Sequence, residues 1–234
     1  MIKAILFDVD GTLSETEEIH RKSFNRAFAV HGLTWHWGQA QYRKLLDVSG
    51  GKERIRFYLS AHPDDFLLIS NVDQFVRSVH GTKTDIYTQL VQDGAAELRP
   101  GIRELIAETV RLGIRRAIAT TTSLPNVEAL LGAAYGRDGM ALFETICAGD
   151  SVPYKKPAPD IYLATLKEMK LRPDECIAIE DSRNGLVAAT AAGIPTVVTP
   201  GIYTSDQRFD EAMLVTTDLQ ASLPEILDEA LALA

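Results

Sequence analysis

The chain has little cysteine, no long apolar run and no cluster of basic residues. Its 234 residues include two cysteines, Cys147 and Cys176, which form neither a CxxC pair nor a metal-binding spacing. We expect both to stay reduced, as in a cytoplasmic protein. The apolar run near the start ends at Asp8, which is too early for a signal peptide or a membrane span.

The charge balance argues against two classes of partner. Lys and Arg total 24 against 32 Asp and Glu, so the formal net charge is −8. Nucleic acids and anionic membranes both require clustered Lys and Arg, so we expect neither as a partner. A small anionic substrate stays compatible with this charge, because a pocket needs only a few local cations. We expect a monomer that acts on such a substrate.

What the sequence does contain is an alternation of short apolar runs with amphipathic segments. The run from Ile2 to Phe7 ends at Asp-Val-Asp-Gly, which predicts a buried strand closed by a turn. Further strands are expected at 114–119, 145–148, 176–179 and 194–198, with helices between them. Such alternation favours parallel pairing, because each parallel connection needs a long crossover. The predicted fold class is α/β, with a doubly wound, Rossmann-like parallel sheet.

Residues 15–90 have a different pattern, which is helical and amphipathic with no convincing strand. Thr16 can cap a helix that runs to about Val30. We therefore predict an α/β core of residues 1–14 and 91–234, with an inserted all-helical cap of residues 15–90 that sets substrate specificity. Trp35 and Trp37 are expected to pack inside this cap.

Reactive side chains follow three of the predicted strands. Asp8 and Asp10 follow the first strand, Thr120 follows the second, and Glu180-Asp181 follows a later one. Ligands of open α/β sheets bind at the carboxyl ends of the strands, so we expect these residues to meet. Each motif alone has a simpler explanation, either an Asx-turn or the capping of the next helix. Their combination favours an active site.

Together with a lysine before a proline, these motifs resemble those of the haloacid dehalogenase-like phosphotransferases in order and spacing. The resemblance covers the whole chain and rests on Asp8-x-Asp10-x-Thr12, Thr120, Lys156 and Glu180-Asp181. Within this superfamily the sequence is similar to the CbbY group, which is close to β-phosphoglucomutase. Four stretches carry that match: 15–20 (ETEEIH), 49–54 (SGGKER), 119–126 (ATTTSLPN) and 155–162 (KKPAPDIY).

The resemblance implies a catalytic set and an aspartyl-phosphate intermediate. Asp8 would be the nucleophile, because a covalent intermediate splits one hard displacement into two easier ones. Asp10 would protonate the leaving group and then activate the attacking water. Thr120 would bind the transferring phosphoryl group, and Lys156 would neutralise Asp8 and a phosphoryl oxygen. We expect the neighbouring Lys155 to be a surface charge.

The count of charges at such a site requires a cation. Asp8, Asp10, Glu180 and Asp181 bring four negative charges and a phosphate dianion adds two, whereas Lys156 returns one positive charge. Oxygen ligands around a phosphate suit Mg²⁺, which we expect as the cofactor. By resemblance, the direct ligands are Asp8, the backbone carbonyl of Asp10, and Asp181, while Glu180 binds directly or through water.

The cap and the segment after Thr120 supply candidates for substrate binding. The stretch from Ser49 to Arg54 joins a glycine-rich turn to two cations at a helix start, which suits a distal phosphate. An ordinary solvated turn is the alternative for this stretch, and interhelical hydrogen bonding is the alternative for His20. The complete set of candidates is Glu17, His20, Gly50, Gly51, Lys52, Arg54, Thr121, Thr122, Ser123 and Asn126.

The CbbY resemblance also implies a sugar bisphosphate substrate, namely xylulose-1,5-bisphosphate, a misfire product that inhibits Rubisco in the Calvin cycle. Three alternatives stay open. These are a β-phosphoglucomutase-like phosphomutase, a phosphatase of another small metabolite such as phosphoglycolate, and a non-catalytic phosphosugar-binding protein. The core motifs do not separate a phosphatase from a mutase. The intact Asp8/Asp10 pair argues against a protein that only binds, because binding does not require both carboxylates.

Overall fold

Six parallel strands form the central sheet of the protein. The computed structural model describes residues 2–63 and 69–226, and its strands are β1 (Ala4–Phe7), β2 (Arg115–Ala119), β3 (Thr145–Cys147), β4 (Cys176–Glu180), β5 (Thr196–Val198) and β6 (Leu214–Val215). They pair in the order β3-β2-β1-β4-β5-β6, and each pair is parallel. This order confirms the predicted doubly wound α/β class and places β1 between β2 and β4.

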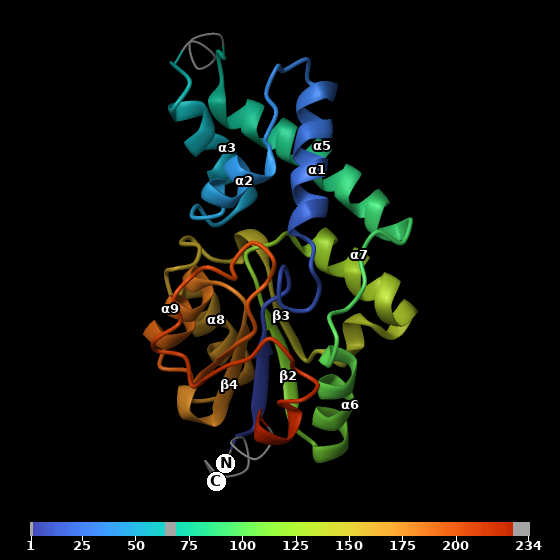
Figure 1. Cartoon of the computed structure of the whole chain (residues 1–234), viewed down its shortest axis with the longest axis vertical. Helices are drawn as coiled ribbons and strands as arrows, with labels where there is room; N and C mark the ends of the chain where they lie inside the picture. Colours follow the sequence, from blue (N-terminus) through green and yellow to red (C-terminus); the bar gives the residue numbers. More distant parts are fainter. Residues whose placement is uncertain (1, 64–68, 227–234) are drawn as a thin grey trace.

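Helices cover both faces of the sheet. α6 (Ile102–Leu112) and α7 (Leu124–Tyr135) lie on one side, whereas α8 (Asp160–Met169) and α9 (Arg183–Ala191) lie on the other (Figure 1). Successive side chains of a strand point to opposite faces. In β1, Ile5 and Phe7 therefore pack with α6 and α7, while Ala4 and Leu6 pack with α8 and α9. This is why the strand is apolar throughout and does not alternate with polar residues.

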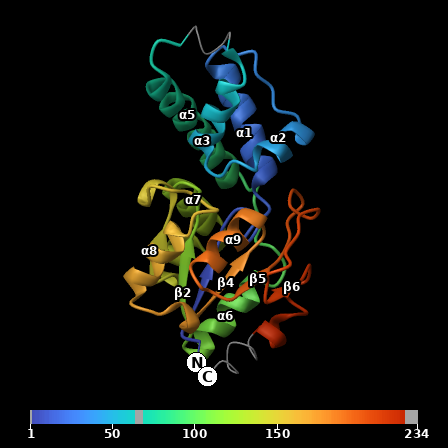
Figure 2. The ribbon, with the colours of Figure 1, turned by 90° about the vertical axis from the view of Figure 1, so that its left-hand side faces the viewer.

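The segment from residue 17 to residue 92, here called the helical region, contains no strand among its described residues. It consists of α1 (Glu17–Val30), α2 (Gln39–Leu45), α3 (Gly51–Ser60) and α5 (Val72–Gln92). Their apolar sides meet around Phe24, Phe28 and Trp37, and both tryptophans pack there as predicted. Figure 2 shows the helical region standing beyond one end of the sheet, with α1 and α5 next to α7. The exact division into cap and core stays a prediction.

Two neighbouring segments connect the helical region to the sheet. Ser14 forms a β-bridge with Leu98, and its hydroxyl donates to the carbonyl of Glu97 at 2.6 Å. Next to this bridge, the guanidinium of Arg99 donates to the carbonyls of Gly11 and Thr199. These bonds fix the loop after β1, which carries Asp8 and Asp10, against the segment that returns from the helical region.

Two further expectations concern cysteine and the membrane. Cys147 and Cys176 are both buried and free, as predicted. Among the described residues, no helix is both long enough and apolar enough to cross a bilayer.

Candidate active site

The loop after β1 brings its first aspartate against the end of β4. Gly11 adopts φ +84°, a conformation that side chains other than glycine rarely take. A Cβ at this position would also lie 2.2 Å from Oδ2 of Asp181. The turn therefore needs glycine for two reasons, and it places Asp8 beside the Asp181 carboxylate.

A buried lysine holds Asp8 from the other side. The ammonium of Lys156 donates to Oδ1 of Asp8 at 2.6 Å and to Oε1 of Glu180 at 2.6 Å. Glu180, the last residue of β4, also accepts a hydrogen bond from the hydroxyl of Tyr162. Lys156, and not Lys155, thus reaches the proposed nucleophile. The prediction that Lys155 is a surface charge is wrong, because its side chain is 10% exposed and pairs with Asp150 at 2.9 Å.

Asp8, Glu180 and Asp181 form an acidic cluster in which one carboxylate oxygen of each lies within 4.8 Å of the others. Burial, and then Glu180 and Asp10, raise the pKa of Asp8 to about 7 despite the opposing effect of Lys156. Burial, Asp8 and Glu180 likewise raise the pKa of Asp181 well above its usual value. Such a set of close, buried carboxylate oxygens is suited to a divalent cation, which would offset the repulsion among them.

Asp10 points away from this cluster, toward the helical region. Its Oδ1 accepts a hydrogen bond from Thr16 Oγ1 at 2.5 Å and lies 2.9 Å from Nε2 of His20. Burial by itself would raise the pKa of Asp10, but His20, Thr16 and Lys83 together outweigh it and lower this pKa. α1 begins after Thr16 as predicted, yet the Thr16 side chain makes no capping bond. Its hydroxyl donates to Asp10 instead. The Asp10 carboxylate is therefore not part of the acidic cluster, and its backbone carbonyl as a ligand stays a prediction.

Lys83 on α5 completes this arrangement, and the sequence analysis missed it. Its ammonium lies 2.6 Å from Nδ1 of His20, and an ammonium can only donate. Nδ1 must then accept, so Nε2 carries the proton that is donated to Asp10. The ring of His20 stacks on Tyr87 at 4.2 Å. A signal was present in the sequence, because Lys83 lies on the buried side of α5 together with Val76 and Val79.

The segment after β2 forms the opposite wall of the site. The backbone N–H of Thr122 donates to Oγ1 of Thr120 at 3.3 Å, and Asn126 donates to Oγ1 of Thr122 at 2.9 Å. Ser123 precedes α7, but its hydroxyl makes no capping bond. Oγ of Ser123 and Oδ1 of Asn126 are buried and have no hydrogen-bond partner within the described part of the chain. Both atoms are thus open to a ligand.

The glycine-rich turn of the helical region faces these residues. Gly50 adopts φ +91° and precedes α3, whose first turn carries Lys52. Lys52 forms an ion pair with Asp150, from the loop after β3. Arg54 is buried and donates to the carbonyl of Leu45 at 3.1 Å and to the hydroxyl of Tyr42 at 3.0 Å. Its guanidinium therefore holds the turn itself, and Lys52 is the more available cation.

One cavity of about 840 Å³ lies between the helical region and the sheet. All predicted site residues line it except Glu180, which is fully buried beneath it. Glu17 lines it as well and accepts a hydrogen bond from the hydroxyl of Tyr42 at 2.8 Å. The cavity also exposes residues that the sequence analysis did not single out, among them Arg77, His80, Lys83 and Asp150.

Comparison with known proteins agrees with this geometry. A family model described as haloacid dehalogenase-like hydrolase matches residues 2–193. The CbbY protein of Cereibacter sphaeroides is 50% identical over 209 residues, which cover 89% of each chain. The crystal structure of CbbY from Rhodobacter sphaeroides in complex with phosphate is 46% identical with a TM-score of 0.87, covering 95% of this chain and 96% of that one. A mutant of that protein in complex with xylulose-1,5-bisphosphate is also 46% identical, with a TM-score of 0.86 over 94% and 96% of the two chains.

The chain belongs to the haloacid dehalogenase-like hydrolases, whose family model covers most of its length. Within that superfamily its relatives place it in the CbbY group, as the sequence motifs predicted. The predicted enzyme class, a phosphatase, is thereby confirmed.

We predict that Asp8→Asn abolishes turnover and stabilises the metal-free fold at alkaline pH. The Asp8 pKa is 3.8 ordinarily and about 7 in the folded protein, so the unfolded chain releases this proton first as pH rises between these values. The metal-free wild type therefore loses stability across that window, whereas the variant does not. In EDTA, thermal unfolding followed by circular dichroism should show a higher midpoint for the variant at about pH 8, and the difference between the two midpoints should shrink as the pH falls to about 4. Equal midpoints at the higher pH would contradict this, and the exposed Asp138→Asn is the control.

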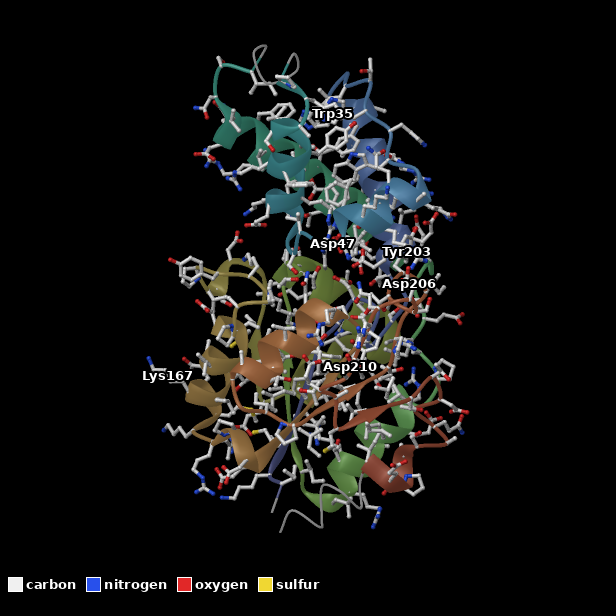
Figure 3. All side chains as sticks on the ribbon, turned by 60° about the vertical axis from the view of Figure 1, so that its left-hand side comes forward. Trp35, Asp47, Lys167, Tyr203, Asp206 and Asp210 are labelled. Carbon is white, nitrogen blue, oxygen red and sulfur yellow. The ribbon has the colours of Figure 1, made fainter. Side chains whose placement is uncertain are left out.

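Lys83→Met is expected to lower kcat by about tenfold, the loss that follows from removing a hydrogen bond to a charged group. Without the ammonium, His20 no longer has one fixed tautomer and Asp10 loses a neighbouring positive charge. Steady-state kinetics of phosphate release would measure the change. Lys167→Met is the matched control, since Lys167 projects from the outer side of the molecule (Figure 3). A Lys83→Met enzyme as fast as this control would remove Lys83 from the mechanism.

Proposed function

We propose that the protein is a Mg²⁺-dependent sugar-bisphosphate phosphatase that transfers the phosphoryl group to Asp8, with xylulose-1,5-bisphosphate as the substrate. The observation that carries the proposal is the contact of Lys156 with Asp8 at 2.6 Å at the floor of the cavity, with Asp10 held separately by Thr16 and by His20 of the helical region. The CbbY structure that contains xylulose-1,5-bisphosphate supports the choice of substrate. In this proposal residues 15–90 act as the cap over a core of residues 1–14 and 91–234, and the enzyme is a cytoplasmic monomer.

The nucleophilic step is assigned to the Asp8 carboxylate. Lys156 holds this group by one oxygen, Oδ1, so the other oxygen is available to attack phosphorus. Thr120 and the backbone N–H groups that follow it would bind the equatorial oxygens of the phosphoryl group. The N-terminus of α7 begins directly after this segment and adds a favourable dipole.

The proton transfers are assigned to Asp10. In the arrangement described here Asp10 is ionised and accepts from Thr16 and His20, which suits the base that later activates water. For the first step it must carry a proton, and the negative charge of an incoming phosphate raises the pKa of a nearby carboxyl group. Asp10 can then protonate the leaving alkoxide, while the helical region over the cavity excludes bulk water.

Asp8, Asp181 and Glu180 are the residues that would hold Mg²⁺, and their oxygen atoms suit this ion. When bound, the ion shields the carboxylates from the phosphate dianion and polarises a phosphoryl oxygen. Oε1 of Glu180 already accepts hydrogen bonds from Lys156 and Tyr162. Oε2, which accepts only a long bond of 3.4 Å from the backbone N–H of Asp181, is therefore the oxygen more available to the ion, directly or through water.

A screen of phosphate release over sugar monophosphates and bisphosphates tests the proposed function. We expect the fastest release from xylulose-1,5-bisphosphate. Release from phosphoglycolate alone would point to a different phosphatase. Isomerised sugar phosphate without free phosphate, in the presence of a catalytic bisphosphate, would show a phosphomutase. Binding of a sugar phosphate without any turnover would show a non-catalytic phosphosugar-binding protein.

Activity should disappear in EDTA and return when Mg²⁺ is added, because the acidic cluster repels a phosphate dianion unless a cation is present. The measurement is phosphate release before and after chelation. The structure offers a second readout, since Mg²⁺ should raise the thermal unfolding midpoint of the wild type. Full turnover in the presence of EDTA would refute the need for a metal.

Lys52→Ala is expected to raise KM for the bisphosphate by about tenfold, the loss typical of one charge-assisted hydrogen bond, and to change KM for a monophosphate much less. Within residues 2–63 and 69–226, Lys52 forms an ion pair with the exposed Asp150, so a distal phosphate can replace that carboxylate. Arg56→Ala on the same helix is the control, because Arg56 does not line the cavity. An equal rise for both substrates would rule out this distal contact.

A further inference from the structure

Tyr203 lies in the loop after β5, yet its ring packs with the helical region. Only 8% of the residue is exposed, and it belongs to the same apolar cluster as Phe24 and Trp37. Its ring meets that of Tyr42 edge-on at 5.7 Å, and its hydroxyl donates to Glu18 at 2.6 Å. A side chain from the sheet side of the molecule is thus built into the core of the helices.

The backbone around Tyr203 is held by the helical region as well. Arg43 on α2 donates to the carbonyl of Tyr203 at 2.7 Å and to that of Ile202 at 2.9 Å. The same guanidinium pairs with Asp206 at 2.9 Å and lies 5.5 Å from the centre of the Tyr203 ring. Figure 3 shows Tyr203 and Asp206 at the boundary between the helices and the sheet. Movement of α1 and α2 must therefore move this loop or break these bonds.

The next residue in the loop contacts the acidic cluster. Thr204 is buried, and its hydroxyl lies 3.2 Å from Oδ2 of Asp181 as a donor. The hydroxyl oxygen of Thr204 itself accepts a hydrogen bond from the backbone N–H of Gly201 at 2.8 Å, which fixes the position of the Thr204 side chain. Further along, Gln207 accepts from the backbone N–H of Arg183, two residues after Asp181, at 2.7 Å. The loop thus contacts Asp181 and the start of α9 on one side and the helical region on the other.

We propose that Tyr203 is a positioning residue that, through Thr204, sets the orientation of the Asp181 carboxylate and hence the affinity of the site for its divalent cation. The proposal rests on the proposed function, in which Asp181 is a metal ligand. Hydrogen-bonding partners of ligands commonly decide metal affinity, because they orient the ligand. Here the partner is Thr204, which directly follows Tyr203 in the chain, and the Tyr203 side chain packs in the helical region. Because such coupling is reciprocal, cation binding stabilises the packed position of Tyr203 by the same free energy by which that position strengthens cation binding.

The competing explanation is that Tyr203 is a packing residue with no influence on the metal site. The two explanations differ in Mg²⁺ affinity and not in stability. Isothermal titration of the full chain with Mg²⁺ measures this affinity directly, without reference to turnover, and thermal unfolding gives stability in parallel.

Three variants and two controls make the test. Thr204→Val should weaken Mg²⁺ binding by about tenfold or more, as found for other residues that orient metal ligands. Tyr203→Ala should weaken it by about fivefold, and Tyr203→Phe, which keeps the ring, by about twofold, since both act through Thr204. Tyr203→Ala combined with Thr204→Val should bind about as weakly as Thr204→Val alone, because the two act along one path.

The controls separate positioning from packing. Ile202→Ala alters the neighbouring side chain, which is 68% exposed, and keeps the backbone bonds to Arg43. Phe28→Leu loosens the same aromatic cluster without touching the loop. Both should bind Mg²⁺ as tightly as the wild type, although Phe28→Leu should unfold at a lower temperature.

Wild-type Mg²⁺ affinity in Tyr203→Ala, together with a lowered unfolding midpoint, would overturn the proposal. If Tyr203→Ala does not fold, the other two variants decide. Wild-type Mg²⁺ affinity in both Tyr203→Phe and Thr204→Val would then overturn the proposal. A wild type that does not bind Mg²⁺ would instead refute the proposed function, so the two failures are distinguishable.

Discussion

The rest of the site depends on one buried ammonium group. Lys156 lies between Asp8 and Glu180 at 2.6 Å from each, with its side chain 4% exposed. Burial by itself lowers the pKa of this lysine, but the two carboxylates outweigh burial and raise it, so the group stays charged. Without that charge, three buried carboxylates would lie together with no cation beside them, which is strongly unfavourable. The sheet order makes the contact possible, because Asp8 and Glu180 come from the adjacent strands β1 and β4.

The two aspartates of the first loop have opposite environments although only one residue separates them. Asp8 lies within the acidic cluster, where burial raises its pKa to about 7. Asp10 turns to His20 and Lys83, and these two neighbours lower its pKa against the effect of burial. The first environment is built by the sheet, and the second by helices α1 and α5. A nucleophile and an acid/base group can therefore stand side by side because two different parts of the fold control them.

The sequence was sufficient for the elements whose pattern is local. The apolar run before Asp8 predicted β1, and the strand–helix alternation predicted the parallel sheet. Long-range contacts needed the family resemblance, since no local pattern brings Lys156 to Asp8 across 148 positions. Polar residues were misjudged where tertiary structure gave them a partner. Lys155 was taken for a surface charge, Lys83 was overlooked in a helix, and Thr16 was expected to cap α1 but bonds Asp10.

The central claim is that the Asp8 carboxylate accepts the phosphoryl group. Rapid acid quenching during turnover, followed by mass spectrometry of the peptides, tests it most directly. The account predicts one added phosphoryl group on the peptide that begins the chain, located at Asp8 and released by mild base, as an acyl phosphate is. A phosphoryl group on any other residue, or complete turnover with no covalent intermediate under conditions that trap acyl phosphates, would contradict it.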